Sequence, residues 1–222
     1  MMARAQTIHV NGNVYCSSDV VHLGIFRKSK NMNHDNFDVK DVNSGNIRFQ
    51  VKRDVFTLHG RQVLLDANGN TLAKSRQKIF STHDRCQVFR GDSSDIKDLL
   101  FTAQRYSNLR FERVVEVYLP SNTKEEFCDF RVKWEDKFCV FYAGEFSTII
   151  AKMHRKHNYA SKFGKKDKFM LEVQPGIDHA FIVALVVFIE DINTGGQYNV
   201  TTAPATTAAV GAVGIGLSVA GL

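Results

Sequence analysis

The chain has 222 residues, of which 44% are hydrophobic, 23% charged and 11% aromatic. This composition excludes a disordered tail and a fibrous repeat, and it is sufficient for one substantial hydrophobic core. The formal net charge is +6, and the segment 151–168 contains seven basic residues against one acid, so the rest of the chain is neutral on balance. The charge therefore indicates one local basic surface rather than a generally basic protein.

The start of the chain, residues 1–14, is expected to be an N-terminal extension. It lacks the apolar core that a signal peptide needs. The four cysteines, Cys16, Cys86, Cys128 and Cys139, show no C-x-x-C spacing. These features predict a reduced, intracellular and cytoplasmic protein.

Short runs of alternating apolar and polar residues follow one another between residues 37 and 174. The clearest runs are 47–52, 128–134 and 168–173. Such alternation is typical of strands with one buried face. Turn signals that contain Gly45, Gly69 and Gly144 separate the runs. About a dozen strands at this spacing indicate an antiparallel sandwich or barrel.

One hairpin can be given a register from the sequence. The strand that ends at Trp134 is followed by a second apolar run, 138–142. Pairing Trp134 with Phe138 places Phe138 and every second residue after it on the inner face, with a three-residue loop. This register turns Cys139 outward, away from Cys128, and argues against a disulfide bond between them.

An apolar segment follows the last alternating run. Residues 177–192 include ten consecutive apolar residues, and their length favours a helix that starts near Asp178. Such a helix is about 24 Å long, shorter than the hydrocarbon core of a bilayer, and being apolar on every side it must be enclosed by protein. The sequence therefore predicts a mainly β fold for residues 15–193, a closed antiparallel β-barrel of about twelve strands that encloses a hydrophobic C-terminal α-helix at 177–192.

The last segment, 194–222, carries no charge and is rich in alanine, glycine, valine and threonine. We interpret it as a low-complexity tail. A membrane anchor is the alternative, but alanine and glycine dilute its strongly apolar residues. We therefore expect no transmembrane span.

Several short motifs surround these elements in a fixed order. They are His83-Asp84-Arg85, Gln87-Val88-Phe89-Arg90-Gly91, Cys128-Asp129-Phe130-Arg131-Val132-Lys133, Tyr142-Ala143-Gly144-Glu145, Met153-His154-Arg155-Lys156-His157 and Ala180-Phe181-Ile182-Val183-Ala184-Leu185. Their order and spacing resemble the plant LURP-one-related family. The resemblance implies a relationship to tubby C-terminal domains and phospholipid scramblases, whose barrel surrounds a hydrophobic helix. It also implies a membrane-associated or defence-related role, because tubby domains bind phosphoinositide head groups and some are regarded as membrane-tethered transcription regulators.

The candidate site is a group of basic residues within the segment 151–168, namely Lys152, Arg155, Lys156, Lys165, Lys166 and Lys168. Several converging cations suit a phosphate group, so the group is either a solvated loop, an anionic phospholipid site or a nucleic-acid site. Nucleic acid is the less favoured partner, because only Tyr159 and Phe163 are available there for base stacking. Among ligands, the family relationship favours phospholipid head groups.

No catalytic residue, metal site or cofactor is predicted. His154 and His157 lack a nearby carboxylate or thiol and point to opposite faces of a strand. Cys86 is near His83 and Asp84 in sequence, but catalytic groups must meet in space. We therefore predict a non-enzymatic binding protein, peripheral at the plasma membrane or nuclear. The alternative is a scaffold that binds an unidentified protein partner without lipid.

Overall fold

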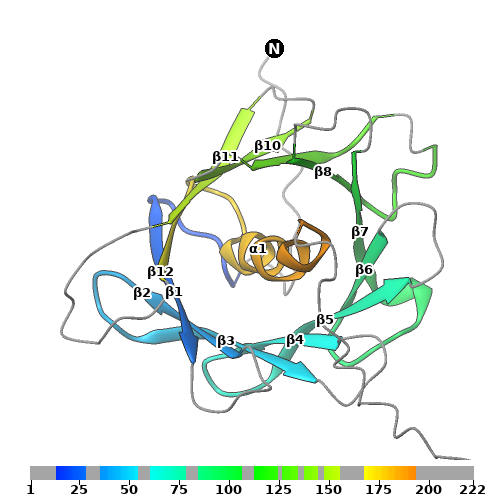
Figure 1. Cartoon of the computed structure of the whole chain (residues 1–222). Helices are drawn as coiled ribbons and strands as arrows, with labels where there is room; N and C mark the ends of the chain where they lie inside the picture. Colours follow the sequence, from blue (N-terminus) through cyan, green and yellow to red (C-terminus); the bar gives the residue numbers. More distant parts are fainter. Residues whose placement is uncertain are drawn as a thin grey trace, which may run out of the picture.

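The computed structural model describes residues 14–28, 36–54, 61–78, 85–106, 113–124, 127–134, 138–144, 148–155 and 168–193. Within these ranges, twelve strands form one closed antiparallel barrel around a single α-helix (Figure 1). The predicted fold class is therefore confirmed. Nearly all of the expected N-terminal extension, 1–14, and the whole of the expected tail, 194–222, lie outside the described residues.

The strands follow one another around the barrel in chain order, and β1 closes it against β12. They are β1 (Val21–Lys28), β2 (Asn36–Asp41), β3 (Ile47–Asp54), β4 (Arg61–Asp66), β5 (Thr71–Lys78), β6 (Arg85–Arg90), β7 (Leu99–Arg105), β8 (Arg113–Tyr118), β9 (Phe130–Trp134), β10 (Phe138–Ala143), β11 (Thr148–Arg155) and β12 (Lys168–Val173). A 3-10 turn, η1 (Ile96–Asp98), precedes β7, and the helix α1 (His179–Asn193) follows β12.

The connections alternate between two ends of the barrel, because every pair of neighbouring strands is antiparallel. We call one end the turn end; its connections are 42–46, 67–70, 91–98, 119–129, 144–147 and, leading into α1, 174–178. We call the other the loop end; its connections are 29–35, 55–60, 79–84, 106–112, 135–137 and 156–167. The helix runs from the turn end toward the loop end along the middle of the barrel (Figure 1).

The turns predicted from glycine lie at the turn end. Gly45, Gly69 and Gly144 have φ angles of 72°, 89° and 65°, a left-handed conformation that glycine adopts without a steric cost. Asp41 and Asp66 each accept hydrogen bonds from two backbone N–H groups of their own turn. These hydrogen bonds lower the pKa of both carboxyl groups; for Asp66 they outweigh the opposing effect of burial.

The helix begins two residues later than predicted, at His179, and ends one residue later, at Asn193. Its start is fixed by Asp178, whose Oδ1 accepts hydrogen bonds from the backbone N–H groups of Ala180 (2.8 Å) and Phe181 (3.1 Å). Asp178 is therefore the N-cap, which supplies acceptors for backbone donors that have no partner inside the helix.

The barrel encloses the helix as predicted. Every residue from 180 to 188 is buried, with at most 5% exposed. The ring of Phe181 lies 5.5 Å from that of Phe101 and 5.2 Å from that of Phe130. Full burial of one large apolar side chain contributes about 1.5–3 kcal/mol, so this helix is a major part of the core.

The predicted register of the hairpin between β9 and β10 is wrong by one residue. Trp134 pairs with Cys139, which is fully buried, whereas Phe138 is 43% exposed. All residues from 138 to 142 are apolar, so alternation could not identify the inner face, and a slip of one residue reverses the faces. Burial raises the pKa of the Cys139 thiol, and none of the four cysteines, all of which the structure describes, forms a disulfide bond.

Candidate functional site

Three of the six predicted basic residues belong to described strands. Lys152 is exposed on β11, opposite Glu172 of β12. Arg155 ends β11 and Lys168 begins β12, so the barrel brings these two strand ends side by side. The other three predicted residues, Lys156, Lys165 and Lys166, belong to connection 156–167, which lies outside the described residues.

Basic residues occupy most strand ends around the whole loop end, beyond the segment predicted from sequence. Among the described strands, eight of the twelve terminal positions at this end are lysine or arginine, and one is acidic, Asp54. The eight are Lys28, Arg61, Lys78, Arg85, Arg105, Arg113, Arg155 and Lys168. Sequence analysis missed this ring because its members are scattered along the chain and come together only when the strand order is known.

The turn end has the opposite charge pattern. Of its twelve strand-terminal positions, one is basic, Arg90, and two are acidic, Asp41 and Asp66. The described parts of its connections contain two lysines and five aspartates, which are Lys97, Lys124, Asp92, Asp95, Asp98, Asp129 and Asp178. The barrel is therefore polarised along its axis, and an anionic surface attracts its loop end and repels its turn end.

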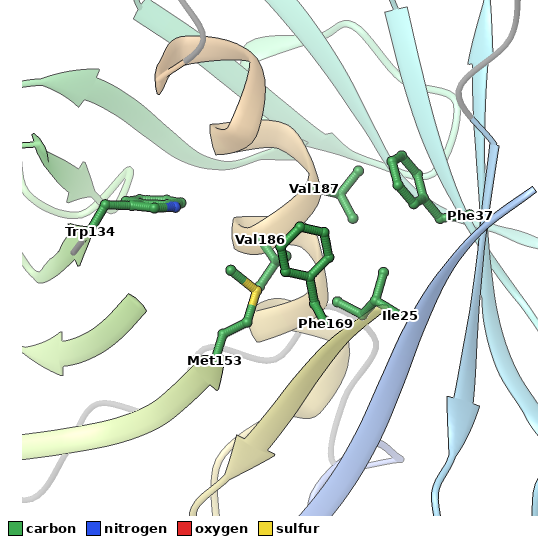
Figure 2. Close-up of a pocket in the computed structure, with 7 residues that line it drawn as sticks. All are labelled: Ile25, Phe37, Trp134, Met153, Phe169, Val186 and Val187. Carbon is green, nitrogen blue, oxygen red and sulfur yellow. The ribbon is translucent and has the colours of Figure 1, made fainter. Parts of the chain in front are cut away.

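An apolar cavity of about 40 Å³ lies toward the loop end, between α1 and the barrel wall. Seven side chains from five strands and the helix line it: Ile25, Phe37, Trp134, Met153, Phe169, Val186 and Val187. Figure 2 shows these side chains gathered around Val186 and Val187 of the helix. Phe169 directly follows Lys168 and pairs with Arg155, so the cavity adjoins the basic ends of β11 and β12.

A larger cavity of about 420 Å³ lies at the turn end, where the segment before β1 crosses the start of α1. His179 lines it with 7% of its surface exposed, and its backbone N–H donates to the Tyr15 carbonyl. Burial, aided by the charge of Arg48, lowers the pKa of His179 to about 4, so the imidazole is neutral at pH 7. Arg48 lies 3.6 Å from the carboxylate of Asp41. The cavity wall therefore carries no net charge and does not resemble a phosphate site.

A buried ion pair lies on the outer side of β8 and β9. Arg131 Nη2 is 2.6 Å from Glu116 Oε1, and the Tyr118 hydroxyl donates to Glu116 Oε2 at 2.8 Å. Burial raises the pKa of Tyr118, and the hydrogen bond to Glu116 adds to this effect. These groups are bonded to one another, which is typical of a structural network that joins neighbouring strands.

Only two of the other residues considered in the sequence as metal ligands or catalytic groups are described by the structure. His154 is exposed on β11 and Cys86 is buried on β6, while His157, His83 and Asp84 lie outside the described residues. Across the described ranges, no group of three or more histidine, cysteine, aspartate or glutamate residues is placed to hold a metal ion. In the same part of the chain, no helix is long and apolar enough to cross a membrane.

These features define a class of protein: a twelve-stranded antiparallel barrel built around an apolar helix, with opposite charge at its two ends. A family model described as LURP-one-related matches residues 21–190. The chain is 46% identical to Protein LURP-one-related 15 of Arabidopsis thaliana over 181 residues, which are 81% of this chain and 83% of that protein. It is 40% identical to Protein LURP1 of the same plant over 187 residues, covering 83% and 90% of the two chains.

This chain is also similar to a protein of known structure. The crystal structure of an Arabidopsis thaliana protein matches 85% of this chain and 99% of its own, with a TM-score of 0.64 and 39% sequence identity. The chain therefore belongs to the LURP-one-related family.

Proposed function

We propose that this protein is a non-enzymatic binding protein that associates reversibly with anionic phospholipid, with its loop end toward the membrane. The observation that carries the proposal is the ring of eight basic strand ends at the loop end, against one at the turn end, among the described strands. An excess of positive charge at one end of the barrel orients the protein when it meets a negatively charged plane.

The basic residues supply enough attraction for reversible binding. Each lysine or arginine near an acidic membrane surface contributes about 1 kcal/mol, and the effect decays within a Debye length of about 8 Å at physiological salt. The four residues Lys152, Arg155, Lys165 and Lys166 would together contribute about 4 kcal/mol. Such binding is lost at high salt, as expected of a peripheral protein.

The wider family relationship supports the same ligand class. A relationship to tubby-like and phospholipid scramblase proteins is part of this proposal, as is a role in plant defence. The location that we propose is the cytoplasmic face of the plasma membrane, where anionic lipid is available, with a nuclear location as the alternative. The proposal needs no cofactor and no catalytic residue.

Vesicle sedimentation at low salt tests the proposal. The wild-type protein should bind phosphatidylcholine vesicles that contain phosphatidylinositol 4,5-bisphosphate and should not bind phosphatidylcholine alone. A variant with Lys152→Glu, Arg155→Glu, Lys165→Glu and Lys166→Glu should bind at least tenfold more weakly, because each reversal replaces an attraction with a repulsion.

The matched control reverses four basic residues at the turn end, with Arg48→Glu, Arg90→Glu, Lys97→Glu and Lys124→Glu. It changes the net charge equally, so a loss of less than twofold shows that position, rather than total charge, determines binding. No vesicle binding by the wild type, or equal losses in the two variants, contradicts the proposal.

The alternative is a scaffold that binds a protein partner without lipid. It would be favoured if the wild type did not bind vesicles and the loop-end variant still bound a protein partner. Competition with single-stranded DNA separates lipid from nucleic acid.

A further inference from the structure

Electrostatic attraction to a membrane does not involve the apolar cavity beside the basic strand ends. On the helix side it is bounded by Val186 and Val187, which are 5% and 4% exposed, and on the barrel side by Met153, which is 7% exposed. Phe169 and Trp134 are half-buried and lie toward the strand ends. The lining thus runs from the buried helix to the basic end of the barrel.

Its size and lining select the kind of group that fits. About 40 Å³ is enough for the end of an alkyl chain and too small for a sugar or inositol ring. A bound water needs two to four polar partners, and the lining side chains offer one polar group, the indole N–H of Trp134. Each methylene group that leaves water for such a site contributes about 0.8 kcal/mol.

Charge complementarity identifies the rest of the ligand. Phe169 of the cavity lies between Lys168, its neighbour in sequence, and Arg155, its partner across the strand pair. A ligand that places a chain in the cavity therefore has its other end near the two strand ends that Arg155 and Lys168 occupy. An anionic group linked to an alkyl chain can occupy both the basic strand ends and the apolar cavity, whereas a free head group can occupy only the basic strand ends.

We propose that the loop-end cavity binds the terminal part of one acyl chain of an anionic lipid whose head group lies at the basic strand ends. This inference rests on the proposed function and narrows it: the ligand is a chain-bearing amphiphile, and the protein recognises more than surface charge.

Trp134 makes the inference directly measurable, because it is the single tryptophan of the chain and lines the cavity. Bromine quenches tryptophan fluorescence only at short range. The probe is 11-bromoundecyl phosphate below its critical micelle concentration, which tests the cavity without a bilayer. We expect saturable quenching of Trp134, no quenching by undecyl phosphate, and at least tenfold weaker quenching by 2-bromoethyl phosphate, whose chain is too short.

Variants test whether the cavity is the binding site. Val187→Phe fills the cavity from the helix and should weaken the quenching of Trp134 by 11-bromoundecyl phosphate at least tenfold, because the alkyl chain then has no space there. Met153→Phe fills it from the barrel wall and replaces Val187→Phe if circular dichroism shows that the latter is unfolded. The control is Val42→Phe at the turn end, where the Val42 side chain is 45% exposed. In this variant, the bromoalkyl phosphate should quench Trp134 fluorescence as strongly as in the wild type.

The possible failures are distinct. Vesicle binding without quenching by the bromoalkyl phosphate overturns this inference and leaves the proposed function intact. Equal quenching by the long and short probes also overturns it, because the chain then plays no part. Chain-dependent quenching without vesicle binding overturns membrane association and supports the cavity as a site for a single amphiphile molecule.

Discussion

The two ends of the barrel use charge in different ways. At the turn end, Asp41, Asp66 and Asp178 accept hydrogen bonds from nearby backbone N–H groups, so their carboxylates stabilise turns and the start of the helix. At the loop end, eight described strand ends carry the same positive sign, and a small apolar cavity lies beside two of them. One end is therefore built to hold the fold together, and the other concentrates features suited to a ligand.

The largest effect that tests this contrast concerns the two halves of α1. Phe181→Ala, in the half near the turn end, should lower the free energy of unfolding by about 3–5 kcal/mol, because the ring packs against two other phenylalanines. Val187→Ala, beside the loop-end cavity, should cost only about 1–2 kcal/mol, since it removes fewer atoms from a site that already contains space. Urea denaturation measures both, and equal losses would contradict the contrast.

The next effect is a pH dependence that belongs to the turn end. The pKa of His179 is lowered to about 4 in the folded state from 6.5 when exposed, so the unfolded chain binds the proton more readily. Stability is therefore fully present above pH 6.5 and falls as the pH decreases to about 4, by roughly 3 kcal/mol at most.

His179→Phe should remove this decline, because the ring remains between Tyr15 and Phe49 without a titrating group. The comparison uses urea midpoints at pH 7 and pH 4.5. His154→Phe is the control, since His154 is exposed on β11 in the loop-end half of the barrel. A decline of the same size in the His179→Phe variant would show that another group is responsible.

The smallest effect concerns the helix cap. Asp178→Ala removes the acceptor for two backbone N–H groups and should lower stability by about 1–2 kcal/mol. Asp178→Asn keeps a side-chain oxygen at the same place and should recover most of that loss. Thermal unfolding of the wild type and the two variants should give the highest melting temperature for the wild type and the lowest for Asp178→Ala. If the alanine and asparagine variants melted together, the cap would not act through its acceptor oxygen.

Much of the fold could be predicted because a strand with one buried face requires apolar residues at every second position. The run at 47–52 alternates strictly, and the run at 168–173 alternates except at Met170. The segment 177–192 is too apolar to lie in water, and these patterns together require a barrel around a helix. The register of β10 could not be predicted, because Phe138 and Cys139 begin two alternating sets that are both apolar. Only the contacts with the rest of the barrel select Cys139 for the interior.

The candidate site was predictable only where its residues are neighbours in sequence. The basic group from Lys152 to Lys168 is a local run, whereas Lys28, Arg85 and Arg113 join it through the antiparallel order of the strands. The cavity has no sequence signal at all, because its seven lining side chains come from six separate elements.

The position of α1 after all twelve strands has a consequence for biosynthesis. A ribosome releases the strands before the segment around which they must close, and the pairing of Leu23 with Leu171 joins distant parts of the chain. Folding therefore cannot finish before α1 has been synthesised, and the incomplete barrel exposes apolar strand faces until the helix arrives. Nascent chains of this protein should depend on chaperones, and a nonsense codon before residue 179 should yield an aggregating product rather than a smaller folded one.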